Sequence, residues 1–472
     1  MKGKEKELFE KTPVFEAVLK LVLPTVMGQI ILVVYNMADT FFIGLTGSDM
    51  LITSVTISMP AFMFLSAISN LFGIGGAAAA SRAMGRRNKD RVGNISAFAL
   101  WGCVLVTGLY GFFLKIGMDP FVDLLGGSHP GVHQVAAEYL MITVVLGGVF
   151  TSVNNLLSHL VRSEGRSLYS SIGIIMGGVL NIFLDPLFMF VILPAGNEVK
   201  GAAIATTLSN AISCLYFVIL LAVLRKKGSL LSFRFNDDAL EDGSFREILL
   251  SGLPACLMTL CENISYAVLD HLMAVSGVSY QAGIGVAKKV NMLAHSMVRG
   301  ISQGVLPLIA YNYAAKEYSR MKKTIRTSSM MAVTVSVVSM VICFVFSRQL
   351  IGFFISGGGD SVLYGSRFLR ILCVGCPFSA FAYAIISFLQ AIGQNWKSFL
   401  LAILRKGLLD IPMMSVLGTL FPVYGIVAAT PITDMICCAV AVVFFVKCTN
   451  NLQEKREINI LKTNQFRTLL TR

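Results

Sequence analysis

The chain has 472 residues, of which 55% are hydrophobic and only 14% are charged, and its mean hydropathy is +0.73. Soluble globular proteins carry about 25% charged residues, so the composition excludes a soluble domain and indicates a polytopic membrane protein. The net charge of +13 does not indicate nucleic-acid binding, because the basic residues are concentrated in short segments between apolar stretches, as on the cytoplasmic side of membrane proteins.

Twelve apolar stretches predict an all-α integral membrane protein. They favour helices over a barrel because they run for about 20 residues or more without alternation. The charged start, "MKGKEKELFEK", has no cleavable signal pattern and leads directly into the first stretch. We place the spans at roughly 15–42, 52–80, 93–117, 136–160, 169–194, 200–224, 248–273, 280–310, 325–347, 365–390, 397–420 and 424–447.

The charges of the loops predict the orientation. The segments 82–91, 225–246 and 316–326 each hold five Lys or Arg residues, whereas 45–50, 119–136 and 274–280 hold none. Alternate loops therefore face the cytoplasm, and we expect both termini to lie on that side of the cell membrane.

The longest polar connection inside the spanning region divides the chain into two lobes. We expect an N-terminal lobe at 1–224, a cytoplasmic linker at 225–246, a C-terminal lobe at 247–447 and a cytoplasmic tail at 448–472. Each lobe has six spans.

The two lobes repeat each other in sequence. "LVLPTV" (21–26) aligns with "SGLPAC" (251–256), "EGRSLYSSI" (164–172) with "IGQNWKSFL" (392–400), and the segment from 199 with the segment from 423. The offset drifts only from 230 to 224, as expected for one duplicated unit. Because each copy has an even number of spans, the repeat is parallel, and two such lobes can enclose a cavity near the midplane and rock about it. A channel, an integral-membrane enzyme or a lipid scramblase could also have this organisation.

Polar residues inside the first lobe predict a cation site. A charge at the bilayer centre costs about 2.5–3.5 kcal/mol on insertion scales, so it needs a partner or a cavity. The lobe places two Asn–Asp pairs, each on one helix face, and two hydroxyl groups in its spans: Asn36 and Asp39, Asn181 and Asp185, and Thr206 and Thr207. Pro186 follows Asp185 and predicts a kink with a freed carbonyl. Such an oxygen-rich pocket could hold a sodium ion, with Asp39, Asn181, Asp185 and Thr206 as its ligands, or a shared proton; the other reading is structural hydrogen bonding between helices.

The second lobe has charges of both signs and predicts internal ion pairs or a gating network. In span 8, four polar residues spaced 3, 4 and 4 apart lie on one helix face: Lys288, Asn291, His295 and Arg299. We expect His295 to be a hydrogen-bonded structural histidine. The candidate residues of this lobe are Glu262, Asn263, Asp270, Lys288, Asn291, His295, Arg299, Arg405, Lys406 and Asp410.

Three motifs, "YNMADTFFIG" (35–44), "NIFLDP" (181–186) and "GAAIAT" (201–206), resemble the multidrug and toxic compound extrusion (MATE) family, within it the bacterial branch that includes the MepA-like drug efflux proteins. The resemblance covers nearly the whole chain. It implies export of cationic amphiphilic drugs in exchange for sodium ions or protons, with a cation site in the N-terminal lobe formed by Asp39, Asn181, Asp185 and either Thr206 or Thr207. Glu262 resembles an acid that another branch uses in span 7. That branch also uses an Asp in span 10, where this chain has no acid between 368 and 390.

Several alternatives remain open at this stage. A flippase for lipid-linked precursors would need a cationic cavity, which Lys288, Arg299 and Arg405 could supply. A major-facilitator transporter is suggested by "GRRNKDRVG" (85–93). An enzyme is not expected, because no nucleophile–base pair or metal-ligand cluster is visible, and no G-x-x-x-x-G-K-[ST] motif indicates nucleotide binding. We expect no cofactor beyond the coupling ion, small cationic substrates, a lipid bilayer around the protein, and a monomer.

Overall fold

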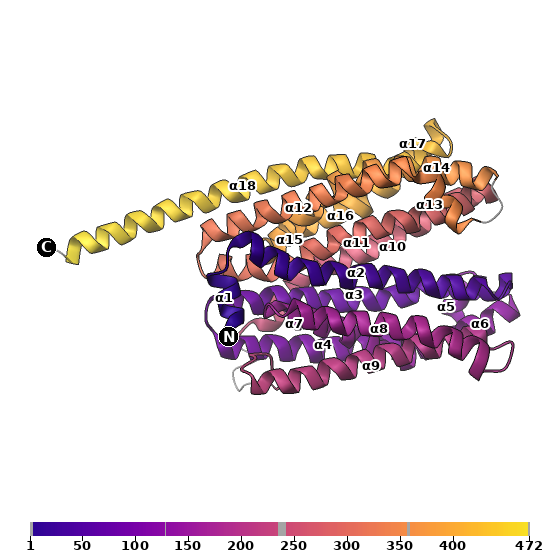
Figure 1. The fold of residues 1–472 in the computed structure, drawn as a ribbon, viewed down its shortest axis with the longest axis horizontal. Helices are drawn as coiled ribbons and strands as arrows, with labels where there is room; N and C mark the ends of the chain where they lie inside the picture. Colours follow the sequence, from indigo (N-terminus) through magenta and orange to yellow (C-terminus); the bar gives the residue numbers. More distant parts are fainter. Residues whose placement is uncertain (1–2, 128, 235–241, 356–358, 471–472) are drawn as a thin grey trace.

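The structure, a computed structural model, describes residues 3–127, 129–234, 242–355 and 359–470. Within these residues the regular structure is entirely helical. The helices form two lobes side by side, α1–α9 below and α10–α18 above in Figure 1. The expected linker, 225–246, lies partly outside the described residues.

The helices of the first lobe are α1 (Lys4–Glu10), α2 (Val14–Gly44), α3 (Asp49–Gly85), α4 (Lys89–Ile116), α5 (Met118–Leu124), α6 (Pro130–Leu140), η1 (Met141–Leu146), α7 (Gly148–Ser163), α8 (Ser167–Leu187), η2 (Phe188–Ile192) and α9 (Glu198–Lys226). Those of the second lobe are α10 (Ser244–Ser276), α11 (Val278–Ala314), α12 (Tyr318–Val345), α13 (Ser347–Phe354), α14 (Asp360–Val374), α15 (Cys376–Ala391), α16 (Asn395–Ile403), η3 (Leu404–Leu408), α17 (Asp410–Leu420) and α18 (Tyr424–Leu470). The segments labelled η are π-helices.

The twelve expected spans correspond to helical segments of the described chain. Eight single helices are long and apolar enough to cross a membrane, and two bent helix pairs raise that number to ten. The other two spans are α11, which is 37 residues long, and the interrupted segment α16–η3–α17. Both carry Lys or Arg residues that are paired inside the second lobe, and the second is divided into segments of 9, 5 and 11 residues.

Matching helices in the two lobes have matching lengths. Helices α3 and α11 both have 37 residues, α4 and α12 both have 28, and α7 and α15 both have 16. Side-chain contacts repeat as well: Ser170 donates to the Ser158 carbonyl at 2.7 Å, and its counterpart Ser398 donates to the Ile386 carbonyl at 3.3 Å. The parallel duplication expected from the sequence is therefore present in the fold.

Each lobe has one span that is broken at a glycine. The axis bends by 48° between α6–η1 and α7, at Gly147, and by 44° between α14 and α15, at Gly375. A Cβ at Gly147 would lie 2.6 Å from Thr207 Oγ1, and one at Gly375 would lie 2.9 Å from Pro431 Cα. Thr207 and Pro431 are counterparts in the repeat, so the same close approach maintains both bends.

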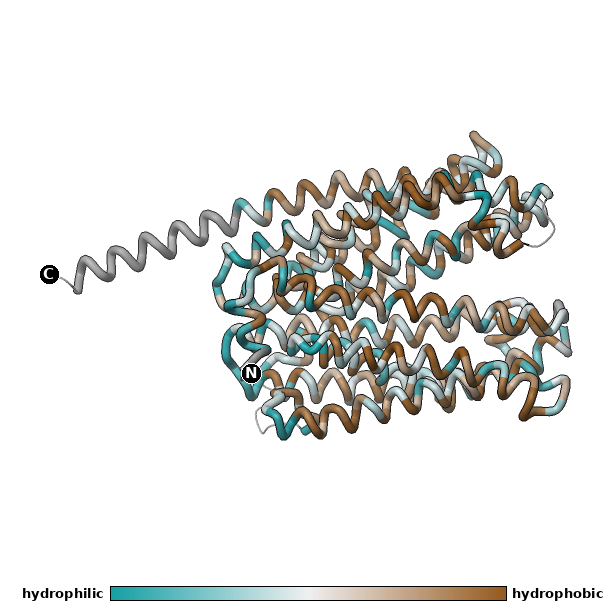
Figure 2. Tube along the Cα trace, viewed as in Figure 1, coloured by the Kyte–Doolittle hydropathy of each residue, from teal (hydrophilic) through white to brown (hydrophobic). Residues whose placement is uncertain are grey.

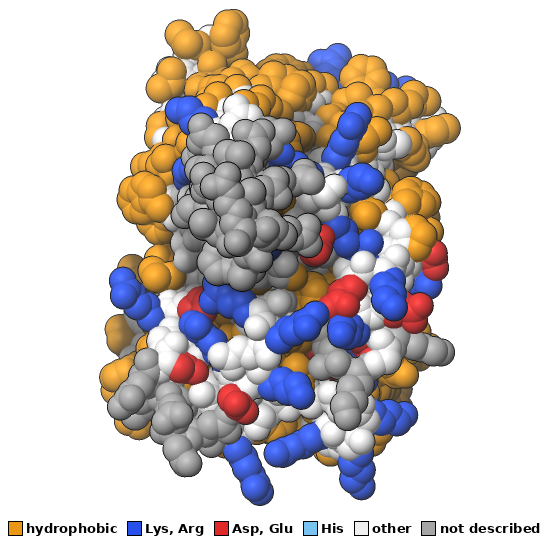
Figure 3. All heavy atoms as spheres, turned by 90° about the vertical axis from the view of Figure 1, so that its left-hand side faces the viewer, with side chains coloured by type: hydrophobic (Ala, Val, Ile, Leu, Met, Phe, Trp, Pro, Cys, Tyr) orange, Lys and Arg blue, Asp and Glu red, His pale blue; other side chains and the backbone are white. Residues whose placement is uncertain are grey.

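The molecule is apolar in the middle and polar at both ends (Figure 2). The end that carries the N-terminus is rich in Lys and Arg (Figure 3), and we call it the basic end. Its exposed basic residues include Arg86 and Arg87 before α4, Lys89 at the start of α4, and Arg225, Lys226 and Lys227 at the end of α9. Arg82, which the sequence placed in a loop, instead lies in the last turn of α3 and is buried.

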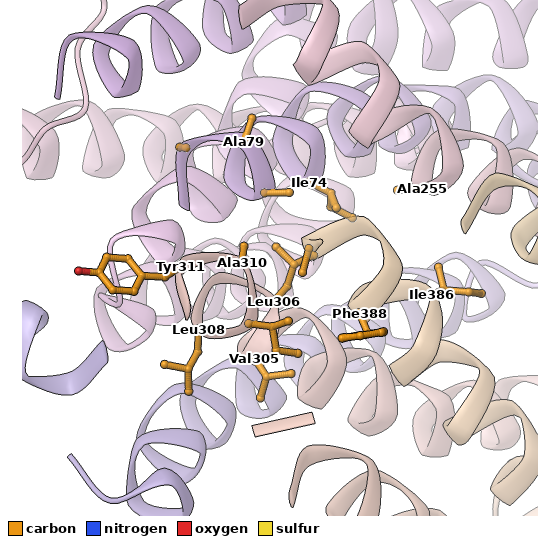
Figure 4. Close-up of a cluster of buried hydrophobic side chains, with 14 of the residues drawn as sticks. Ile74, Ala79, Ala255, Val305, Leu306, Leu308, Ala310, Tyr311, Ile386 and Phe388 are labelled. Carbon is orange, nitrogen blue, oxygen red and sulfur yellow. The ribbon is translucent and has the colours of Figure 1, made fainter. Parts of the chain in front are cut away.

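The lobes meet along a seam in which α3 packs on α10 and α2 packs on α11. Buried apolar side chains from α3, α10, α11 and α15 fill it, as Figure 4 shows with Ile74, Ala255, Leu306 and Ile386. Glycines bring the backbones close, because a Cβ at Gly300 would lie 2.7 Å from Val26 Cα and one at Gly304 would lie 3.1 Å from the Leu21 oxygen.

Candidate functional site

Four polar side chains meet inside the first lobe, and we call them the acid cluster: Asp39 of α2, Asn181 and Asp185 of α8, and Thr206 of α9. All four are buried, with Asp185 at 0% exposure and Asp39 at 9%. Asn181 Nδ2 donates to Asp185 Oδ1 at 3.1 Å and to Thr206 Oγ1 at 3.4 Å. The carboxyl groups of Asp39 and Asp185 lie next to each other and interact electrostatically. The cluster therefore joins three helices through oxygen-bearing groups.

Three oxygens of the acid cluster have no hydrogen-bond partner, although they are buried: Asp39 Oδ1, Asn181 Oδ1 and Asp185 Oδ2. Among the described residues, no Lys or Arg forms an ion pair with either carboxylate. Buried polar atoms in native proteins nearly always have a partner. Buried unpartnered oxygens are suited to a proton or a hard cation, which takes oxygen ligands.

Glycines on α8 make the acid cluster possible. A Cβ at Gly178 would lie 2.8 Å from Ile31 Cγ2 of α2, and a Cβ at Gly177 would lie 3.2 Å from the Ser213 side chain of α9. Helix α8 continues past Pro186 and changes to the π-helix η2 at Phe188. The sequence predicts a kink at the proline; the helix instead runs through it, and the change to a π-helix comes two residues later.

Asn36 and Thr207, which the sequence grouped with the acid cluster, bond elsewhere. Asn36 Nδ2 donates to the Leu32 carbonyl of its own helix at 2.6 Å. Thr207 Oγ1 donates to the Ile142 carbonyl at 3.2 Å, at the π-helix η1. Helical spacing places Asn36 on the same helix face as Asp39, but it does not determine which hydrogen-bond partner the Asn36 side chain has.

Two tyrosines lie near the acid cluster that the sequence patterns did not indicate. Tyr35 of α2 and Tyr139 of α6 both interact electrostatically with Asp39 and Asp185, and Tyr139 is 4% exposed. Tyr35 precedes Asn36 within the quoted motif, but Tyr139 belongs to a different span and no sequence pattern links it to the acids.

Amide and hydroxyl groups continue from the acid cluster toward the basic end. Asn210 Nδ2 donates to the Thr206 carbonyl at 3.0 Å, and Asn154 Nδ2 donates to Asn210 Oδ1 at 3.1 Å. Ser213 then donates to Asn154 Oδ1 at 3.0 Å. These contacts join α9 to α7 on the side of the acid cluster that faces the basic end.

The second lobe contains paired charges in place of an acid cluster. Its ion pairs are Arg299–Glu262 at 2.9 Å, Arg405–Asp434 at 2.7 Å, Lys406–Asp410 at 2.9 Å and Lys288–Asp270 at 2.5 Å. The Arg405–Asp434 and Lys406–Asp410 pairs are almost fully buried. Every acid and base that the sequence selected in this lobe thus has an opposite charge beside it.

Tyrosine rings and polar side chains surround these ion pairs. The Arg405 guanidinium lies 4.3 Å from the Tyr383 ring centre, and Lys406 Nζ lies 5.5 Å from that of Tyr266. The His295 ring nitrogens contact the Asn291 carbonyl and Ser379 Oγ, both at 3.0 Å. Asn291 Oδ1 in turn accepts from Cys376 Sγ. Asn263 is half-buried, and its side-chain nitrogen has no partner in the described residues.

Asp434 was missed from the sequence, although a signal for it was present. At the offset of 224 that aligns span 12 with span 6, Asp434 corresponds to Asn210. Both lie one helical turn after a threonine and face the interior of their lobes. The repeat therefore marks the position as internal, and the aspartate there compensates Arg405.

The comparisons with known proteins agree with the fold. The family model described as MatE matches twice, at residues 24–187 and 254–416, which is well over half of the chain. The chain belongs to the MatE family. The two matches begin 230 residues apart, at Pro24 and Pro254, so they coincide with the two lobes.

MatE proteins are transporters, and the chain is similar to several of them along its whole length. It is 29% identical to the multidrug export protein MepA of Staphylococcus saprophyticus over 93% of this chain and 95% of that protein, and 27% identical to MepA of Staphylococcus haemolyticus over 96% and 98%. A solved outward-facing multidrug resistance MATE transporter of the MOP superfamily has a TM-score of 0.86 at 22% identity, covering 96% of this chain and 100% of that one. The chain is therefore a multi-span membrane transporter.

Proposed function

We propose that this protein exports cationic amphiphilic compounds across the cell membrane in exchange for protons or sodium ions, by alternating access. The observation that carries the proposal is the acid cluster, in which Asp39 and Asp185 are buried in contact with each other without a basic partner. Two adjacent buried carboxyl groups either share a proton, so that only one of them is ionised, or are both ionised with a cation between them. Taking up and releasing that ion changes the charge of the lobe by one unit.

The coupling ion binds to the acid cluster, with Asp39, Asn181, Asp185 and Thr206 as its ligands. The unpartnered oxygens support this assignment, because buried oxygens that lack a donor favour the binding of a proton or cation. The basic end faces the cytoplasm, by the positive-inside rule, so both lobes begin and end on that side.

The ion pairs of the second lobe weaken the alternative of a flippase for anionic precursors. The bases that could bind a phosphate, Lys288, Arg299 and Arg405, each have a carboxylate partner. A solved MOP-superfamily transporter from Pyrococcus furiosus, for which a reversed polarity of the binding pocket suggests a different function, has a TM-score of 0.84 at 22% identity over 96% of this chain and 99% of that one. Pocket polarity is thus the property that separates the two proposals.

The protein acts as a monomer without an organic cofactor, nucleic-acid partner or enzymatic step in this proposal. Its substrates are small lipophilic cations, which the carboxylates of the acid cluster attract.

The test is ethidium efflux from vesicles that contain the purified protein, under a proton gradient or a sodium gradient imposed separately. The wild type should extrude the dye under one of the two gradients, and Asp39→Asn should lose that efflux while remaining folded. The effective gradient identifies the ion. A folded wild-type protein that moves no organic cation under either gradient contradicts the proposal, and flipping of a lipid-linked substrate would replace it.

A further inference from the structure

Two buried arginines lie at the lobe seam, and only one of them has a counter-ion. Arg82 and Arg162 are both 3% exposed. Arg82 Nε lies 2.9 Å from Glu247 Oε1 across the seam, and its terminal nitrogens donate to Ser251 and to two carbonyls of α15. Arg162 forms no ion pair with any described residue.

The contacts of Arg162 are neutral and long. Its Nη1 lies 3.3 Å from His159 Nδ1 and 3.5 Å from Gln303 Oε1, and its Nη2 lies 3.3 Å from Ser170 Oγ. Its Nε is buried and has no acceptor. Arginine stays charged at physiological pH, and a buried charge without a partner costs several kcal/mol. The guanidinium therefore lacks an anion.

The fold does not require a charge at this position. The repeat offset of 228, which aligns Ser170 with Ser398, also aligns Arg162 with Gln390 of the second lobe. Gln390 is equally buried, at 3% exposure, and it is neutral. The same helix position is thus compatible with an uncharged side chain, so Arg162 is not explained by packing.

A small cavity lies beside the guanidinium, with groups from both lobes around it. It is lined by Ile74, Ala77, His159, Arg162, Gln303, Leu306 and Pro307. Gln303 of α11 accepts at Oε1 from Arg162 and from Gln29 Nε2, the latter at 3.4 Å. With its oxygen used twice, the Gln303 amide presents its NH₂ group as a donor. Gly73 makes room for the imidazole, because a Cβ there would lie 2.8 Å from His159 Cδ2.

We propose that this seam cavity binds a small inorganic monoanion, of the size of chloride, as the counter-ion of Arg162. The guanidinium supplies the charge, the Gln303 amide supplies a second donor from the opposite lobe, and apolar residues of α3 and α11 exclude larger or divalent anions. The site takes a halide rather than a phosphate, because only one unpaired positive charge lies in it.

The position of the cavity between the lobes makes the anion a conformational effector. The lining residues come from α3 and α7 on one side and from α11 on the other, so the complete site exists only while the lobes are together at the basic end. By linkage, the anion then stabilises that conformation by its binding free energy. This coupling rests on the proposed alternating access, whereas the binding itself does not.

The direct test is anomalous diffraction from crystals of the full-length protein grown in bromide. We expect a bromide peak beside Arg162 and Gln303. A peak that is absent there, with only water in the cavity, overturns the proposal. This result is independent of transport, so it stays informative even if dye efflux fails.

The second test measures thermal unfolding of the purified protein in sodium chloride and in sodium gluconate at equal ionic strength. The wild type should melt at a higher temperature in chloride, with a saturable dose response. Gln303→Glu would place a carboxylate beside Arg162 as an internal counter-ion, so this variant should fold stably and lose the chloride response. Arg162→Gln should lose it as well, with at least about tenfold weaker halide binding.

Arg225→Gln is the matched control, because Arg225 is an exposed arginine at the basic end, and it should respond to chloride as the wild type does. An unchanged chloride response in Gln303→Glu contradicts the proposal even if Arg162→Gln does not fold.

Discussion

Gly252 of α10 touches the backbone of α3 at Leu71 so closely that a Cβ on Gly252 would overlap the Leu71 carbonyl group. The contact belongs to the lobe seam, where backbone atoms rather than side chains define the separation of the two helices. We expect Gly252→Ala to force the lobes apart at the basic end, at a cost beyond the 1–3 kcal/mol or so of ordinary overpacking. Spin labels at the exposed positions Arg86 and Lys316, one on each lobe, should report a longer distance in this variant than in the wild type. Its ethidium efflux should be slower.

Gly285→Ala is the control for this substitution. Gly285 lies inside α11, and a Cβ there would meet nothing within 4 Å, so alanine should leave the label distance unchanged and stabilise the helix by up to about 1 kcal/mol. Equal distances in the two variants would show that the close approach does not set the lobe separation.

The ion pair of Arg82 with Glu247 should stabilise the same seam. Removing one partner of a buried pair costs about 3–5 kcal/mol, because the other charge stays buried alone. Arg82→Gln should therefore lower the melting temperature and shift the label distance toward the open state. Arg91 also pairs with Glu247, at 2.7 Å, but its side chain is 25% exposed, so Arg91→Gln should cost less than about 1 kcal/mol. If the two variants behave alike, burial does not govern this contact.

Two asparagines of the first lobe should differ in importance for coupling. Asn181 donates to Asp185 and Thr206, whereas Asn36 donates to the Leu32 carbonyl of its own helix. Asn181→Ala should lose most of the gradient-driven ethidium efflux, and Asn36→Ala should keep most of it. The reverse order would place the coupling ion next to Asn36, in a cluster different from the one described.

The Arg405–Asp434 pair should be structural. Asp434→Asn would leave a buried guanidinium uncompensated, with an expected loss of about 3–5 kcal/mol and a lower melting temperature in detergent. The double variant Arg405→Met/Asp434→Leu removes both charges and should recover much of that stability. If the double variant is as unstable as the single one, the pair has a role that apolar packing cannot replace.

Much of the fold could be predicted from the sequence, because the bilayer imposes simple rules on length, polarity and loop charge. The duplication was visible from aligned residues such as Pro24 and Pro254, and the family model starts at those two positions. Two predicted spans carry the charged residues Arg299 and Lys406, which are costly to place in a membrane. Their carboxylate partners, which offset that cost, become adjacent only in the folded lobe.

The candidate sites were less predictable. Helical spacing placed Asp39 and Asp185 on their helix faces, but their contact with each other depends on glycine packing between α8 and α2, which no local pattern encodes. The same limitation explains the inclusion of Asn36 and Thr207, which face inward but bond to backbone carbonyls. Asp434 and Arg162 were within reach of the sequence through the repeat, since their counterparts, Asn210 and Gln390, are neutral.

The bends at Gly147 and Gly375 have a consequence for how such a transporter can evolve. Similar bends at matching positions of two parallel copies indicate descent from a six-helix chain that once assembled as a symmetric pair. In that ancestor any substitution would have changed both halves at once. One lobe could therefore not have kept an acid cluster while the other acquired ion pairs. Fusion into one chain removed this constraint: the hinges were kept in duplicate, while the buried acids and bases could diverge independently.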